Sequence, residues 1–195
     1  MDLRETSPIP AAALHVAAFR DHLRLSSGFA DSTTQDALLE QYLRAAIAAV
    51  EGRVARALFQ RGYVLRLTRW RDGYAQALPI APVLSIEAFT LLDRDGGASV
   101  VDPSRYVLDA DGTRPKVKAA GTILPTIPTR GAVEIAFTAG FGPLWEDIPA
   151  DLRQAVLLLA SQYYEGREAG GDQDMAFGIR ALLERWRDLR LGRGA

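Results

Sequence analysis

The chain of 195 residues contains no cysteine and only two histidines, two methionines and two lysines. The lack of cysteine excludes disulfides, thiol nucleophiles and thiolate metal sites. The formal net charge is −1, so no overall basic field predicts nucleic-acid binding. No apolar run approaches the roughly 18 residues of a membrane span, and the N-terminus has no signal-peptide pattern. These absences predict a soluble, intracellular protein without membrane contact.

Apolar residues make up 48% of the chain, enough to bury a core of useful size. The order of helical and strand periods predicts an α+β fold that is mainly helical. The clearest helical period is Leu39, Leu43, Ala46/Ile47, Val50, Val54 and Leu58, with Glu40 and Arg44 paired on the outer face. We expect this helix to end near Gln60, with Gly62 stopping it. The predicted helices cover about 11–24, 33–60, 149–167 and 179–190. A single domain, 1–195, is expected.

Between the second and third helices, about residues 63–139, the pattern changes to the two-residue period of β-strands. YVLRLTRW (63–70) and AVEIAFTAG (132–140) alternate most clearly, and shorter strands are expected between them. No strand–helix–strand alternation occurs, so a parallel nucleotide-binding sheet is not expected. The sequence therefore predicts an antiparallel β lobe inserted between two helical pairs.

A glycine turn, Gly140-Phe-Gly142, joins the last strand to a helix, as in a phosphate-binding loop. The Lys and Ser/Thr of a Walker loop and the third glycine of a dinucleotide fold are both missing. The acids Glu146 and Asp147 at the start of the helix would repel a phosphate. Pro149 suits a first helical position. We interpret Gly140, Gly142 and Pro149 as a structural turn that lets strand and helix pack closely.

Other possible chemical sites are weak. DRDGG (93–97) and DADG (109–112) lack the spacing of an EF-hand and read as hairpin turns. His15 and His22 are seven residues apart on one helix, about 10 Å by helical rise, too far to chelate one metal alone. No catalytic triad, cofactor motif or metal motif is present. An acid pair beside an aromatic, at Trp145, Glu146 and Asp147, leaves open a small α+β enzyme or ligand-binding module.

Two features favour a binding role. AVLLLA (155–160) is apolar on every side, so this helix must be covered all round by the sheet and by helices or another subunit. Charge is also segregated: residues 53–71 carry six Arg and no acid, 145–174 carry seven acids against two Arg, and 178–195 carry five Arg against two acids. Opposed blocks suit head-to-tail contacts between copies, although solvated faces would explain each block alone. The subunit-interface candidates are Arg53, Arg56, Arg66, Arg69, Glu165 and Glu168.

Five segments, in order, resemble the head–tail connector, or adaptor, proteins of long-tailed bacteriophages and phage-like gene transfer agents. They are AALHVAAFRDHLRL, the long helix DALLEQYLRAAIAAVEGRVARALFQRGY with Arg56-Ala57-Leu58, LPIAPVLSIEAFTLLDRDG with Pro82-Val83, VEIAFTAGFG with IPADLRQAVLLLASQYYEGRE, and FGIRALLERWR. The resemblance covers nearly the whole chain. Its motifs are structural rather than catalytic, so its specificity lies in their order and spacing.

The resemblance implies a non-enzymatic ring of twelve copies below the portal protein at one capsid vertex. Such a ring extends the channel for non-specific double-stranded DNA and carries a stopper or tail-terminator protein. It also implies that the C-terminal segment, from Ile179 to Ala195, reaches toward the portal. Candidate contacts are Arg185, Trp186, Arg187 and Arg190, although Trp186 packing on its own helix is an equal alternative.

The implied location is the bacterial cytoplasm during assembly and then the neck of the mature particle. Whether the particle is an infectious phage or a gene transfer agent stays open, with the arginine content favouring the latter. Another neck protein, such as a stopper or tail terminator, is a weaker alternative because those are mostly β. The sequence indicates no cofactor and no catalytic residue.

Overall fold

A computed structural model describes residues 1–24, 33–166 and 175–187 of the chain. The chain divides into two compact units, a β unit of Met1–Pro8 with Phe59–Phe141 and a helical unit of Ile9–Leu58 with Gly142–Ala195. The four helices and the antiparallel strands confirm the predicted α+β fold, with the β lobe lying between α2 and α3 in the sequence. Within the described ranges, no helix is long and apolar enough to span a bilayer.

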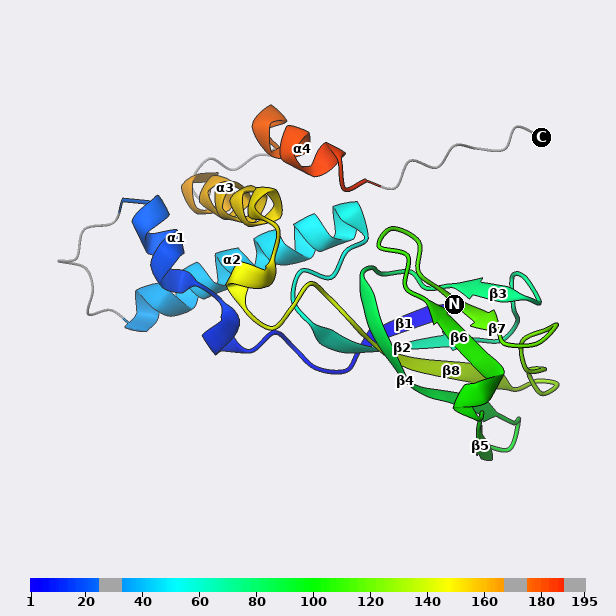
Figure 1. The fold of residues 1–195 in the computed structure, drawn as a ribbon. Coiled ribbons are helices and arrows are strands. Elements are labelled where there is room, and N and C mark those ends of the chain that lie inside the picture. The colour runs from blue at the N-terminus through cyan, green and yellow to red at the C-terminus, as the bar shows by residue number, and fades with distance from the viewer. Residues whose placement is uncertain (25–32, 167–174, 188–195) are drawn as a thin grey trace. The chain divides into compact units, whose positions relative to one another are not determined.

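In its described residues, the helical unit contains four α-helices and two short 3₁₀ turns. The elements are η1 (Ala11–Ala13), α1 (Val16–His22), α2 (Thr33–Val54), η4 (Trp145–Asp147), α3 (Ala150–Gly166) and α4 (Phe177–Glu184). Helix α3 packs against α2 and against α4, and α1 packs against α2 (Figure 1). In the apolar segment 155–160, Ala155, Val156, Leu159 and Ala160 are buried, whereas Leu157 and Leu158 are only half-buried, so the segment is not covered on every side within this chain.

Helix α2 confirms the predicted period, since Leu39, Leu43, Ala46, Ile47, Val50 and Val54 are all at most 2% exposed. The expected surface pair also forms, with a 2.8 Å ion pair between Arg44 and Glu40. The predicted end at Gln60 is wrong. Ala55 adopts a left-handed conformation (φ 53°) and ends the helix, and the Glu51 carboxylate accepts a hydrogen bond from the Leu58 N–H at 2.7 Å. Gly62 instead lies in a strand.

The first helix is shorter than predicted. Ala11–Ala13 form a 3₁₀ turn, Leu14 is extended, and the α-helix begins only at Val16. Leu14 and Phe19 are both buried. In a continuous helix from Ala11 these two side chains, five residues apart, would point in different directions, and the break allows both to reach the interior. The start of α3 is one residue later than expected, and the Pro149 carbonyl accepts from the Arg153 N–H. The last helix begins two residues earlier than predicted, at Phe177, and it ends at Glu184, so the predicted end at 190 is wrong. Residues 185–187 after it form a turn.

The β unit contains two antiparallel sheets (Figure 1). The strands are β1 (Asp2–Glu5), β2 (Arg61–Leu67), β3 (Ala75–Ala77), β4 (Val83–Leu92), β5 (Ala98–Val100), β6 (Tyr106–Asp109), β7 (Lys116–Ala119) and β8 (Ala132–Ala139). The five-stranded sheet has the order β1-β2-β8-β4-β5 and the three-stranded sheet β3-β7-β6. Side chains of β2 alternate as predicted, with Tyr63, Leu65 and Leu67 buried.

Strand β1 was not predicted from the sequence. Its residues DLRE pair antiparallel with β2, from Asp2 opposite Arg66 to Glu5 opposite Tyr63. Three of its four residues are charged, and it forms one edge of the sheet, a position where charge discourages pairing with another chain. The Arg61 side chain, which is 6% exposed, donates to Glu5 Oε2 at 3.0 Å and so ties this edge to β2.

The two aspartate-rich segments are turns, as predicted. Asp93 Oδ1 accepts hydrogen bonds from the N–H groups of Asp95 and Gly97 between β4 and β5. Asp111 Oδ1 accepts from the N–H groups of Thr113 and Arg114 between β6 and β7, which lowers the pKa of the Asp111 carboxyl. Both carboxylates therefore stabilise the turns.

Glu87, near the register shifts of β4, forms two side-chain hydrogen bonds on the sheet surface that can be tested by titration. Its carboxylate accepts hydrogen bonds from the hydroxyls of Ser85 (2.5 Å) and Thr138 (2.9 Å), which lower the Glu87 pKa from its ordinary value of 4.5. Hydrogen bonds to the Glu87 carboxylate stabilise the fold at pH values above the ordinary pKa of the group. This stabilisation is lost as the pH falls through the lower pKa of the folded state. We predict that S85A/T138V raises the Glu87 pKa toward 4.5 in a carboxyl NMR titration. S99A on β5 is the control, and an unchanged Glu87 pKa in the double variant would contradict the assignment.

Candidate assembly surfaces

The glycine turn lies where the chain passes from the β unit to the helical unit, between Phe141 and Gly142. Gly140 has φ 132°, its N–H donates to the Pro82 carbonyl at 2.9 Å, and a Cβ there would lie 2.2 Å from the Phe59 carbonyl oxygen. A Cβ on Gly142 would lie 2.3 Å from Asp147 Oδ2. Gly140 requires glycine because backbone atoms occupy the space of a side chain, and a side chain at 142 would require the Asp147 carboxylate to move. The close contacts at Gly140 and Gly142 therefore explain both glycines by packing of the chain.

Asp147 and Glu146 have different roles. Asp147 Oδ2 accepts from the Leu144 N–H at 2.9 Å and fixes the one-turn helix before α3. Glu146 points outward with a side chain 62% exposed, and its carboxylate lies 3.8 Å from Nδ1 of His15. The His15 ring meets the edge of Trp145 with 6.4 Å between centroids. The acid pair is therefore not a pair of cooperating carboxylates.

A small cavity of about 190 Å³ lies beside these residues. It is lined by Ala12, Ala13, His15, Leu144, Trp145 and Glu146. Ligand pockets for drug-sized molecules usually measure about 300–1,000 Å³. This cavity, which we call the Trp145 pocket, has the size for a single side chain.

A larger groove of about 740 Å³ lies among the ends of α1, α3 and α4. Its lining consists of His22, Leu23, Arg24, Leu158, Ser161, Gln162, Glu165, Gly166, Ala176, Gly178 and Ile179. In residues 1–24, 33–166 and 175–187, no three His, Asp or Glu side chains gather as a metal ion would require. The groove lining contains one acidic side chain, the exposed Glu165, and one guanidinium group, that of the exposed Arg24.

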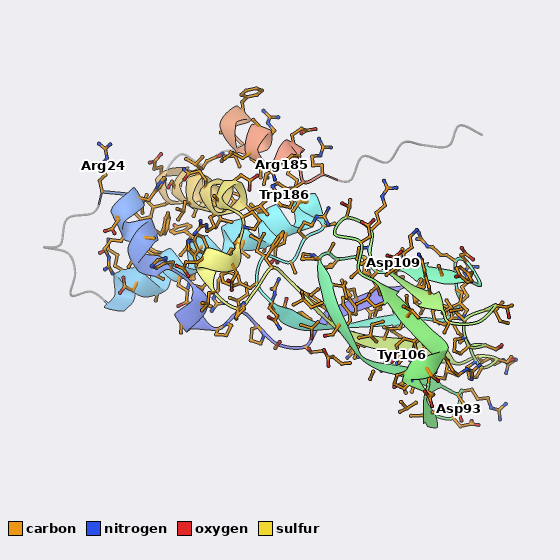
Figure 2. All side chains as sticks on the ribbon, viewed as in Figure 1. Arg24, Asp93, Tyr106, Asp109, Arg185 and Trp186 are labelled. Carbon is orange, nitrogen blue, oxygen red and sulfur yellow. The ribbon has the colours of Figure 1, made fainter. Side chains whose placement is uncertain are left out.

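Three of the four predicted portal contacts lie directly after α4, and Arg190 lies outside the described residues. The Trp186 indole N–H donates to Asp151 Oδ2 at 2.8 Å, and an Arg185 nitrogen lies 3.4 Å from the same oxygen. The Arg185 guanidinium also stacks over the Trp186 ring, 4.9 Å from its centroid, and Figure 2 shows the two side chains together. The Trp186–Asp151 bond thus joins the C-terminal end of α4 to the first turn of α3. Arg185 (71% exposed) and Arg187 (48%) remain at the surface.

The bond between Trp186 and Asp151 has a measurable stability effect. W186F keeps an aromatic ring but removes the indole donor from a carboxylate that is only 19% exposed. A hydrogen bond to a charged group contributes about 1.5–3 kcal/mol, so we expect the free energy of unfolding to fall by about 1.5 kcal/mol in urea denaturation. R187A, which removes a surface pair with Glu184, should change it by less than about 0.5 kcal/mol. Equal stabilities of the two variants would contradict a structural role for the indole.

The predicted subunit-interface residues differ in exposure. Arg53, Arg66, Arg69 and Glu165 are exposed, whereas Arg56 is only 5% exposed and belongs to the interior. Arg66 forms a 3.1 Å ion pair with Glu134, which Arg4 also approaches at 3.8 Å. Glu168 lies outside the described residues. The basic block 53–71 therefore offers four guanidinium groups at the surface, those of Arg53, Arg66, Arg69 and Arg71.

Sequence reasoning did not identify Phe177 as a surface residue of the helical unit. Phe177, the first residue of α4, is 81% exposed. Ile179 and Leu183 of the same helix are buried, at 3% and 0% exposed. Phe177 and Ile179 are two residues apart, about 200° around a helix, so they point to opposite sides. That angle was the signal available in the sequence.

Comparison with solved structures gives matches over the whole chain. The chain is 54% identical to a component of the neck of an empty gene transfer agent (GTA) particle computed with C6 symmetry, with a TM-score of 0.92. It is 54% identical to a chain of the virion of a native GTA particle (TM-score 0.89) and 50% identical to one of the neck of a native GTA particle computed with C12 symmetry (TM-score 0.87). Each alignment covers 100% of this chain and 99% of the other. No family model and no curated protein matches. The chain therefore belongs to the same family as these neck components of gene transfer agent particles.

Proposed function

We propose that this chain is a head–tail adaptor, a structural component of the particle neck. Twelve copies form a ring below the portal protein, extend the DNA channel, and carry a stopper or tail-terminator protein. The chain is made in the bacterial cytoplasm and ends in the neck of the assembled particle. The observation that carries the proposal is the identity of 50–54% over the full chain with components of neck assemblies computed with C6 and C12 symmetry.

The described surfaces support this role. The end of the helical unit that carries Arg185 and Arg187 is exposed, and arginine is common at protein interfaces. We assign these residues, with Trp186 as the anchor that positions them and Arg190 beyond, to the portal contact. The C-terminal segment then has a fixed starting point, since Trp186 is bonded to α3.

Charge supports contacts between copies. Exposed Glu165 borders the 740 Å³ groove, and exposed Arg53, Arg66 and Arg69 belong to the basic block. A guanidinium of one copy beside the carboxylate of the next gives a charge-assisted contact. We assign Arg53, Arg66, Arg69, Glu165 and Glu168 to the contact between subunits, with buried Arg56 supporting its own fold.

The near-neutral chain suits a channel through which DNA moves. The formal net charge is −1, and the two lysines lie near aspartates: Lys118 pairs with Asp109 at 2.6 Å, and Lys116 is opposite Asp109 in the β-sheet register. Strong phosphate binding rises with the number of neutralising cations and would hold a duplex in place. DNA contact in this role is non-specific and weak.

An enzyme or ligand-binding module is the alternative that the acid pair suggested. The pocket at Trp145 measures about 190 Å³, and the Asp147 carboxylate is occupied by the turn before α3. A catalytic carboxylate pair needs both groups to face one substrate. These observations favour the structural role over the enzymatic one.

Deletion of the gene in a particle-producing strain tests the adaptor role. We expect capsids without attached tails and a loss of gene transfer, restored when the intact gene is supplied from a plasmid. The physical reason is that a head and a tail without their joining ring share no complementary surface. Tailed, transfer-competent particles from the deletion strain would contradict the proposal.

A further inference from the structure

Phe177 is a large apolar side chain left uncovered within its own chain. Its exposed fraction, 81%, is the highest among the large hydrophobic side chains of the described residues. It begins α4, whose N-cap residue Ala176 provides no side-chain cap and whose first turn carries no acid. The positive end of this helix therefore carries a projecting aromatic ring and no negative charge. A partner site with an apolar surface for the ring and a carboxylate for the helix end would bind both features.

The Trp145 pocket has the complementary properties. Its lining includes the apolar Ala12, Ala13, Leu144 and Trp145, and its volume of about 190 Å³ suits one side chain. The lining also includes Glu146, whose carboxylate is exposed and can accept hydrogen bonds from a helix N-terminus. Aromatic rings at His15 and Trp145 provide edges and faces for a further ring.

Phe177 cannot fill the pocket of its own chain. The Ala176 N–H donates to Gln162 Oε1, which places the start of α4 beside the C-terminal part of α3. The pocket residues 144–146 precede α3, which begins at Ala150. Twelve residues of helix, from 150 to 162, span about 18 Å at 1.5 Å per residue. The projection and the pocket therefore lie at opposite ends of α3.

We infer that Phe177 of one copy inserts into the Trp145 pocket of the next copy, with Glu146 at the N-terminus of the inserted helix. Two different surfaces that meet in this way form a head-to-tail contact, the type that closes a ring under cyclic symmetry. The charges agree, because an acid meets the positive, N-terminal end of α4, whose first turn carries no acid. This inference rests on the proposed ring.

Substitution in each partner surface tests the contact. F177A and A13W, the second filling the pocket, should each lower the number of copies per particle at least about tenfold, since truncating an aromatic anchor has effects of this size. F177L should stay close to wild type because it keeps an apolar side chain. Y74A is the control, because Tyr74 is an exposed aromatic (50%) in the β unit. The melting temperature of the free F177A protein should be unchanged.

Cysteine cross-linking identifies the partners directly, because the chain has no cysteine of its own. In particles oxidised under mild conditions, A13C/F177C should give a ladder of covalent multimers, whereas A13C and F177C alone should not. If F177C disturbs assembly, particles that mix the double variant with wild type should still give cross-linked dimers.

Particles that incorporate F177A and A13W like wild type, or that contain the double cysteine variant without cross-links, would overturn the inference and leave the ring intact. Dimers from F177C alone would indicate a symmetric contact and would also overturn it. Absence of the wild-type chain from purified particles would instead contradict the proposed function.

Discussion

Gly140→Ala should lower the free energy of unfolding by about 3 kcal/mol or more, the combined size of a backbone held at an unfavourable φ and an overpacked contact. Gly140 has φ 132°, and an added Cβ would lie 2.2 Å from the Phe59 carbonyl oxygen and 2.5 Å from the Gln60 nitrogen. Backbone atoms cannot turn aside as a flexible side chain can. The Gly140 N–H also donates to Pro82, so any shift of the turn strains this bond.

The measurement for Gly140 is thermal or urea unfolding of the purified chain. At about 2–4 °C per kcal/mol for a chain of this size, the melting temperature should fall by about 6–12 °C. Gly73→Ala is the matched control, because a Cβ there meets no heavy atom within 4 Å and its backbone is unstrained. Equal melting temperatures for the two variants would show that the turn does not require glycine.

Phe89→Ala should cost about 3–5 kcal/mol, the usual range for truncating a buried phenylalanine. Phe89 on β4 is fully buried. Its ring lies 5.1 Å from that of Tyr106 on β6 and 5.8 Å from that of Trp70. The side chain therefore joins the five-stranded sheet to the three-stranded sheet, and its loss leaves a cavity at this junction.

Tyr106 provides a second measurement on Phe89→Ala. Burial disfavours the Tyr106 phenolate and so raises the pKa of the hydroxyl above 10.0 in the intact chain. The free energy of unfolding is therefore unaffected by this group below its ordinary pKa and falls as the pH rises through the folded-state pKa. Exposure of the ring should lower that pKa toward its ordinary value in a phenolate absorbance titration. Val100→Ala, at a side chain 73% exposed, should change stability by less than about 0.5 kcal/mol. An unchanged stability of Phe89→Ala would contradict the central packing role.

The sequence predicted most of the elements because their apolar periods are regular. The period from Leu39 to Val54 and the alternation of Tyr63, Leu65 and Leu67 follow from packing on one face, and the structure confirms both. The end of α2 was missed because the left-handed residue is Ala55 rather than a glycine. Strand β1 was missed because DLRE carries three charges and pairs with β2, about sixty residues away.

The candidate surfaces were only partly predictable. The arginines after α4 and the Gly140–Gly142 turn could be identified from residue type and order. The bond from Trp186 to Asp151 joins residues 35 positions apart, and no local pattern indicates such a contact. The burial of Arg56 beside the exposed Arg53 depends on the turn at Ala55. The exposure of Phe177 depends on which face of α4 packs against α3.

Electron microscopy of particles containing this chain, with symmetry resolved at the neck, tests its structural role most directly. We predict a closed ring of twelve copies between the portal protein and the tail, with the helices after Gly142 recognisable in each copy. A neck map in which no density fits the chain, or particles from which it is absent, would contradict that role.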